Sequence, residues 1–328
     1  MSPSWQARFL NAGVRMLVRR RRWGADERAV ARRARRLFGS TPLYQRLRTR
    51  GLEVRPIHDS TNSSSSNDGV GGGGGIVRGE WLAAQGAAEN EVVLYIHGGG
   101  YVSCSAATHR PITAALARLT SRRVFSLNYR LAPEHRYPAA LDDAVAAYEW
   151  LLADEGIAAG AISIAGDSAG GGLVLGTLLR ARDAGLPLPA CAVCFSPLTD
   201  LAGEGESQRF NDGRCAMFRS GNLHEFAPAY LGGESAHNAY ASPVYADLQG
   251  LPPLLLQVGS TELLLDDARR VHHKILEAGG DSELEIYADV AHCWQMLDGL
   301  VPEARIALRQ AASFIGEHSS AGGNARKR

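Results

Sequence analysis

The stretch IAGDSAGGG, Ile164 to Gly172, decides the fold. It places Ser168 between two glycines, directly after an apolar run and directly before a helix-like segment. In a strand–turn–helix setting, the pattern Gly-x-Ser-x-Gly presents a serine nucleophile on a sharp turn. Such a turn strains the serine backbone and leaves room only for glycine at the two flanking positions. We expect a nucleophile here, although the pattern alone also fits an ordinary Gly/Ser turn at a helix start.

Apolar runs along the chain predict an α/β fold around this turn. Strand-like runs occur at residues 91–97, 122–128, 161–166, 190–196, 253–259 and 282–288. Helix-like stretches occur at residues 108–120, 138–153, 169–184, 266–278 and 302–317. Continuous apolar strands that alternate with helices indicate a mostly parallel sheet covered on both faces. Cys191 and Cys194 fall in one of these strands, so we expect core residues on opposite faces of the sheet and no metal site.

The remaining segments divide the chain. We expect two helices in residues 1–50 and a flexible Ser/Gly-rich linker at 51–76, which cannot bury enough apolar surface to fold. Residues 203–242 break the alternation of strands and helices. They predict an insertion over the carboxyl edge of the sheet, where open α/β sheets place their sites. The core is then expected at residues 77–202 and 243–318, with a disordered tail at 319–328.

Charge is unevenly distributed. The whole chain carries +1, but residues 1–50 hold 14 Arg against only Asp26 and Glu27, a net charge of +12. Such a stretch could contact nucleic acid, an acidic membrane surface or the acidic remainder of the protein. An apolar stripe of helical spacing, including Leu10 and Val14, favours packing on the protein's own body, and we expect no nucleic-acid partner.

The compartment is predicted from what the sequence lacks. No apolar run reaches the length of a membrane span, and the N-terminus does not resemble a secretory signal. The five cysteines are scattered and form no disulfide framework. We therefore expect a cytoplasmic protein.

A nucleophilic serine needs partners, and three other segments offer them. HGGGY, residues 97–101, follows a strand, and the amides of Gly98 and Gly99 could join that of Ala169 in an oxyanion hole. His292 lies in a short loop after a strand and before the last helix, which suits a general base. Glu262 directly follows the strand at 253–259 and suits the acid that orients this base.

Asp266 is the alternative acid, although Asp266 and Asp267 fit better as the start of a helix. The order Ser168, Glu262, His292 matches the Ser…Asp/Glu…His order known for one large class of hydrolases.

Four motifs together resemble the hormone-sensitive-lipase-like family of α/β-hydrolases, carboxylesterases with the GDXG signature. They are HGGG at 97–100, NYRLAPEHRYPAALDDA at 128–144, GDSAG at 166–170 and LPPLLLQVGSTELLLDDA at 251–268. The resemblance implies about eight strands, mostly parallel, under a helical cap formed by the N-terminal helices and residues 203–242. It implies no metal and no cofactor.

The same resemblance gives roles to individual residues. It implies Ser168 as nucleophile, His292 as base, and Gly98, Gly99 and Ala169 as oxyanion donors. The family's acid is usually an aspartate, whereas this sequence has Glu262 in the matching place.

We expect hydrolysis of carboxylic esters through an acyl-enzyme. A capped pocket entered beside Tyr101 indicates short to medium acyl groups. Two alternatives stay open: a lactonase or amidase with the same triad, and a ligand-binding receptor on the same fold. Plant hormone receptors that resemble the family lack the catalytic histidine, which is present here. The resemblance is compatible with a homodimer, and the basic N-terminus could contact an anionic membrane surface.

Overall fold

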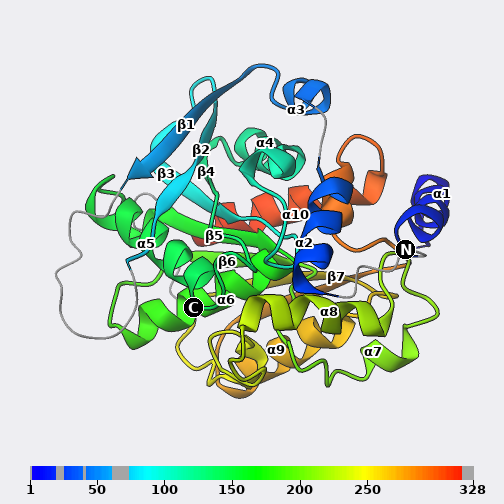
Figure 1. Ribbon diagram of the computed structural model, residues 1–328. Coiled ribbons are helices and arrows are strands. Elements are labelled where there is room, and N and C mark those ends of the chain that lie inside the picture. Colours follow the sequence, from blue (N-terminus) through cyan, green and yellow to red (C-terminus); the bar gives the residue numbers. More distant parts are fainter. Residues whose placement is uncertain (1, 20–25, 40–41, 61–73, 320–328) are drawn as a thin grey trace.

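One eight-stranded sheet organises the computed structural model, which describes residues 2–19, 26–39, 42–60 and 74–319 (Figure 1). The sheet order is β1-β2-β4-β3-β5-β6-β7-β8. β2 runs antiparallel to both of its neighbours, and every other adjacent pair is parallel. The strands are β1 (Leu52–Ser60), β2 (Val77–Ala84), β3 (Ala88–Ile96), β4 (Arg122–Leu127), β5 (Ile162–Asp167), β6 (Cys191–Phe195), β7 (Leu254–Gly259) and β8 (Ser282–Tyr287). This confirms the predicted fold class.

Helices cover both faces of the sheet and extend beyond it. They are α1 (Trp5–Val14), α2 (Glu27–Leu37), α3 (Pro42–Arg48), α4 (Arg110–Thr120), α5 (Ala139–Ala153), α6 (Ala169–Asp183), α7 (Ser207–Phe210), α8 (Ser220–Leu231), α9 (Leu265–Glu277) and α10 (Pro302–His318). A π-helical turn, Arg15–Arg19, continues α1. The five helices expected between Arg110 and His318 are present.

Alternation along the strands fills two cores. In β3, Leu94 packs in the core that includes α5, α6 and α9, whereas Val93 packs in the core that includes α4 and α10. Cys194 and Cys191 also fall in these two different cores, which confirms their expected placement on opposite faces. Figure 1 shows α4 and α10 on one side of the sheet and α5 and α6 on the other.

Two expectations for the N-terminal part are wrong. The predicted linker at 51–76 begins with a strand, because Leu52 and Val54 alternate with polar residues and pack against the α4/α10 core while β1 pairs with β2. Residues 1–50 form a third helix, α3, which begins at Pro42, a residue suited to the first helical position. Most of the Ser/Gly-rich segment, 61–73, and residues 320–328 of the predicted tail lie outside the described part of the chain.

The carboxyl ends of the parallel strands meet along one edge of the sheet. Segments that follow β3, β5, β7 and β8 carry the HGGG motif, Ser168, Glu262 and His292, respectively. These residues are far apart in sequence, and the parallel topology alone brings them to the same edge.

Candidate active site

Ser168 lies between the end of β5 and the start of α6. Its backbone has φ 52° and ψ −122°, a conformation that non-glycine residues rarely adopt. A Cβ at Gly170 would lie 2.1 Å from the carbonyl oxygen of Ile96, and one at Gly166 would lie 2.7 Å from the same atom. Glycine is therefore required at both flanking positions, as the sequence pattern predicts.

The serine hydroxyl begins a continuous chain of hydrogen bonds. His292 Nε2 lies 2.9 Å from Ser168 Oγ, and His292 Nδ1 lies 2.6 Å from Glu262 Oε2. An ionised carboxylate can only accept hydrogen bonds, so the imidazole Nδ1 donates to it. The Nε2 atom is then left to accept the hydroxyl proton of Ser168, which is the arrangement that a general base requires.

Glu262, and not Asp266, contacts the histidine. The other oxygen of Glu262, Oε1, accepts hydrogen bonds from Ser196 Oγ at 2.7 Å and from the Gly259 amide at 2.6 Å, and the side chain is buried. Asp266 lies in the first turn of α9, where its carboxylate accepts from the Ser207 amide at 2.8 Å. The sequence alone did not decide between Glu262 and Asp266, and in the structure only Glu262 contacts His292.

The structure corrects the position of one predicted oxyanion donor. The Gly98 amide donates to Asp167 Oδ1 at 2.9 Å, so it is already engaged. Gly99 and Gly100 instead line the cavity beside Ser168, with φ angles of 116° and 63°. No described residue accepts a hydrogen bond from the amides of Gly99, Gly100 or Ala169. Three donors thus remain available, shifted by one residue from the predicted set.

A buried carboxylate holds the glycine loop in place. Besides the Gly98 amide, Asp167 accepts from the Tyr95 hydroxyl at 2.6 Å and lies 3.2 Å from His109 Nε2. Burial opposes ionisation of Asp167, but His109 and the hydrogen-bond donors hold its pKa at about 2. Sequence reasoning missed His109, which lies directly before α4 and gives no signal of its own in the sequence.

Tyr101 does not line the cavity, contrary to the sequence expectation. Its backbone φ is 65°, its side chain is buried, and its ring stacks on Tyr230 with 3.8 Å between ring centroids. The left-handed conformations at Gly100 and Tyr101 accompany this inward placement, while Gly100 lines the cavity.

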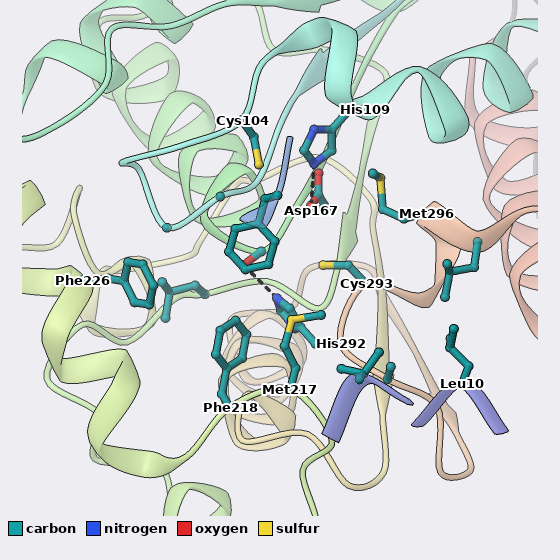
Figure 2. A pocket seen from close by; sticks show the side chains of 18 residues that line it. Leu10, Cys104, His109, Asp167, Met217, Phe218, Phe226, His292, Cys293 and Met296 are labelled. Carbon is teal, nitrogen blue, oxygen red and sulfur yellow. Dashed lines mark hydrogen bonds and ion pairs between the residues drawn. The ribbon is translucent and has the colours of Figure 1, made fainter. Parts of the chain in front are cut away.

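An apolar cavity of about 230 Å³ opens over the serine. Figure 2 shows its lining, with His109 and Asp167 near one end, His292 in the middle and Leu10 near the other end. Apolar walls come from both segments outside the sheet: Leu10, Val14 and Phe38 from residues 1–50, and Met217, Phe218 and Phe226 from residues 203–242. Such a site suits a small apolar group joined to one polar, reacting group.

The described ranges lack two kinds of feature. In them, no group of three or more His, Cys, Asp or Glu side chains is placed to hold a metal ion. No helix in this part of the chain is both long and apolar enough to cross a bilayer.

Comparisons with known proteins point to one family. A family profile described as the alpha/beta hydrolase fold matches residues 93–296. An acetyl-hydrolase of Streptomyces hygroscopicus is 40% identical over 81% of this chain and 91% of its own length. An esterase of Acinetobacter venetianus is 37% identical over 73% of this chain and 78% of its own length.

Solved structures agree with these relatives. An esterase from the bacterial hormone-sensitive lipase family is 37% identical, with a TM-score of 0.83 over 98% of this chain and all of the other. A second crystal structure, of a protein soaked with p-nitrophenyl butyrate, is 34% identical, with a TM-score of 0.84 over 97% of this chain and all of the other.

Proposed function

Because the chain belongs to the hormone-sensitive-lipase family of α/β-hydrolases, we propose that it hydrolyses carboxylic esters with Ser168 as nucleophile, His292 as general base and Glu262 as the orienting acid. The observation that carries this proposal is the unbroken chain of hydrogen bonds from Ser168 through His292 to Glu262, at 2.9 and 2.6 Å, beneath an apolar cavity.

Acylation begins with attack by Ser168 Oγ on the ester carbonyl carbon, while His292 Nε2 takes the hydroxyl proton. Glu262 stabilises the imidazolium and keeps the ring in its tautomer. The carbonyl oxygen becomes an anion among the amides of Gly99, Gly100 and Ala169. One such donor typically lowers the barrier by about 3 kcal/mol, and the positive end of α6 adds to this effect.

Loss of the alcohol completes acylation, and attack by water then begins deacylation. His292 returns the proton to the oxygen of the leaving alcohol as the C–O bond breaks, which leaves an acyl group on Ser168. A water molecule then gives its proton to His292 and attacks the acyl carbon. The carboxylic acid departs as Ser168 regains its proton, so the catalyst is restored.

The size and lining of the cavity support esters of short to medium acyl chain. Its volume of about 230 Å³ is below the roughly 300 to 1,000 Å³ of pockets for drug-sized ligands. The likeness to an acetyl-hydrolase, and to a protein soaked with p-nitrophenyl butyrate, supports the same range. Residues 1–50 and 203–242, which supply the apolar walls, act as the cap in this proposal.

The proposal also includes a cytoplasmic location, a homodimer and peripheral contact of the basic N-terminal segment with an anionic membrane. Cell fractionation tests the first, and sedimentation velocity of the full chain tests the second.

The deciding experiment is hydrolysis of p-nitrophenyl esters of increasing acyl length by wild type and Ser168→Ala. We expect activity that falls for long chains and is lost in the variant. Ser163→Ala is the matched control, because Ser163 lies in β5, the strand that leads to Ser168, but its hydroxyl bonds to Ser319 Oγ and it does not line the cavity. A folded wild type that cleaves no ester, or a Ser168→Ala variant with full activity, would refute the proposal.

A further inference from the structure

The first helix presents two different faces. Leu10 and Val14 line the cavity and Ala7 is buried, so one face of α1 packs on the protein. The opposite face carries Trp5 and Phe9, which are 73% and 78% exposed. Figure 1 shows α1 at the edge of the molecule, apart from the sheet, and Figure 2 shows Leu10 directed toward the cavity.

Exposed apolar side chains continue beyond α1, and others lie on α3, which stands apart from α1 in Figure 1. Met16, in the turn that continues α1, is 61% exposed, and Leu43 and Leu47 of α3 are 69% and 62% exposed. Ser4, which caps α1, donates a hydrogen bond to Glu303 at the start of α10. Arg48 of α3 pairs with Asp298, in the loop before α10. Leu300, between these two acids, is 60% exposed. We call the exposed apolar side chains of α1 and its continuation, Trp5, Phe9 and Met16, the N-terminal apolar face.

The positive charge of arginines near this face favours a negatively charged partner. Exposed Arg8 and Arg15 lie in α1 and at the start of the turn that continues it. The sequences of α1 and α3 contain no acidic residue. A two-fold contact between copies would bring like charges together, because the same patch faces itself. Aromatic side chains that insert while arginines pair with headgroups are typical of helices that lie on anionic lipid surfaces.

We propose that the N-terminal apolar face docks the protein on an anionic lipid surface, from which the cavity takes ester substrates. The substrate class then consists of apolar esters dispersed in that surface, and this part rests on the proposed esterase function. Only the width of one helix, about 10 Å with its side chains, separates Trp5 and Phe9 from the cavity wall formed by Leu10 and Val14.

The contacts that hold α1 do not involve the exposed aromatic rings. Ser4 donates to Glu303 from its amide at 2.6 Å and from its hydroxyl at 2.9 Å, and Asn11 Nδ2 donates to the Asp289 carbonyl oxygen at 2.5 Å. Ala7 packs with Trp294 in a small core of its own. Substitutions at Trp5 and Phe9 therefore remove the docking side chains and leave the anchoring contacts intact.

The test is co-sedimentation of the full chain with vesicles of phosphatidylcholine alone or mixed with phosphatidylglycerol. Wild type should bind the mixed vesicles more tightly, and Trp5→Ser/Phe9→Ser should weaken this binding about a hundredfold. Arg8→Glu should weaken it about tenfold at low salt and less at high salt. Leu276→Ser/Ile286→Ser, which removes two exposed apolar side chains elsewhere, is the matched control and should bind as wild type does.

Two activity assays accompany the binding. Hydrolysis of dissolved p-nitrophenyl acetate should be equal in wild type and Trp5→Ser/Phe9→Ser. Hydrolysis of p-nitrophenyl decanoate carried in mixed vesicles should be faster in wild type. A wild type that does not hydrolyse p-nitrophenyl acetate would refute the esterase function. The docking proposal is tested separately, because vesicle binding is measured without any turnover.

Three results would overturn the docking proposal while leaving the esterase intact. The first is equal binding of wild type to both vesicle compositions, and the second is an equal loss of binding in Leu276→Ser/Ile286→Ser. The third is a dimer that Trp5→Ser/Phe9→Ser converts to monomer without any change in vesicle binding. In that case the face joins two copies of the chain.

Discussion

Glu262→Gln isolates the contribution of the orienting acid. Glu262 Oε1 accepts from Ser196 and Gly259, and a glutamine oxygen can keep both of these hydrogen bonds. The amide nitrogen of the new side chain would then face His292 Nδ1 and donate to it. This holds the imidazole in the wrong tautomer, with a proton on Nε2, so that Ser168 loses its base.

The expected loss in kcat is about 10⁴, the size typical of an acid-to-amide change in such triads, or about 5 kcal/mol of barrier. The assay is kcat for p-nitrophenyl butyrate, with Ser168→Ala as the floor and circular dichroism to verify folding. Asp266→Asn is the matched control and should stay within a few fold of wild type, because Asp266 binds the Ser207 amide and not the histidine. Equal damage from the two variants, or a Glu262→Gln enzyme within tenfold of wild type, would refute the reasoning.

Three other changes test the scaffold and the cavity. Gly170→Ala places a methyl group 2.1 Å from the Ile96 carbonyl oxygen and should lower the free energy of unfolding in urea by at least about 3 kcal/mol. Gly13→Ala is the control and should not destabilise the protein, because no atom lies within 4 Å of the added methyl group. Burial, helped by the charge of Asp200, raises the pKa of Asp267 to about 8, so the folded state binds this proton more tightly than the unfolded state, whose carboxyl has a pKa near 4. This contribution to the free energy of unfolding is fully present below about pH 4 and is lost as pH rises toward 8. Between pH 5 and 8 it should fall by about 3 to 4 kcal/mol in wild type and much less in Asp267→Asn, measured as urea midpoints. Leu10→Ala shortens a side chain of the cavity wall, so the cavity becomes larger and the preferred p-nitrophenyl ester should have a longer acyl chain. An unchanged dependence of activity on acyl length would show that α1 does not limit the acyl group.

The sheet and the elements that carry the site were predictable because their sequence signals are local. β5, the Ser168 turn and α6 form one uninterrupted signal of apolar run, glycines and helix. Each strand from β3 to β7 contains an apolar run, and in β8 Leu284 and Ile286 alternate with glutamates. β1 and β2 gave weaker signals, because each lies at or next to an edge, mixes charged with apolar residues and flanks a Ser/Gly-rich segment.

Details of the site depend on backbone direction, which a single sequence does not reveal. Which glycines of the HGGG motif line the cavity depends on the positive φ angles at Gly99 and Gly100 and on the hydrogen bond from the Gly98 amide to Asp167. The inward placement of Tyr101 has the same origin. The choice between Glu262 and Asp266 required their distances, since both follow the same strand within seven residues.

The catalytic side chains and the cavity walls are attached to the molecule in different ways. Ser168, Glu262 and His292 stand on segments that follow central strands, whereas Leu10 and Val14 belong to a terminal helix joined to the body by a handful of hydrogen bonds from Ser4, Asn11 and Arg15. Such a helix can be substituted as one unit. We therefore expect substitutions within α1 to change the choice of substrate while Ser168, His292 and Glu262 keep their hydrogen bonds, so that selectivity can evolve or be engineered separately from the reaction itself.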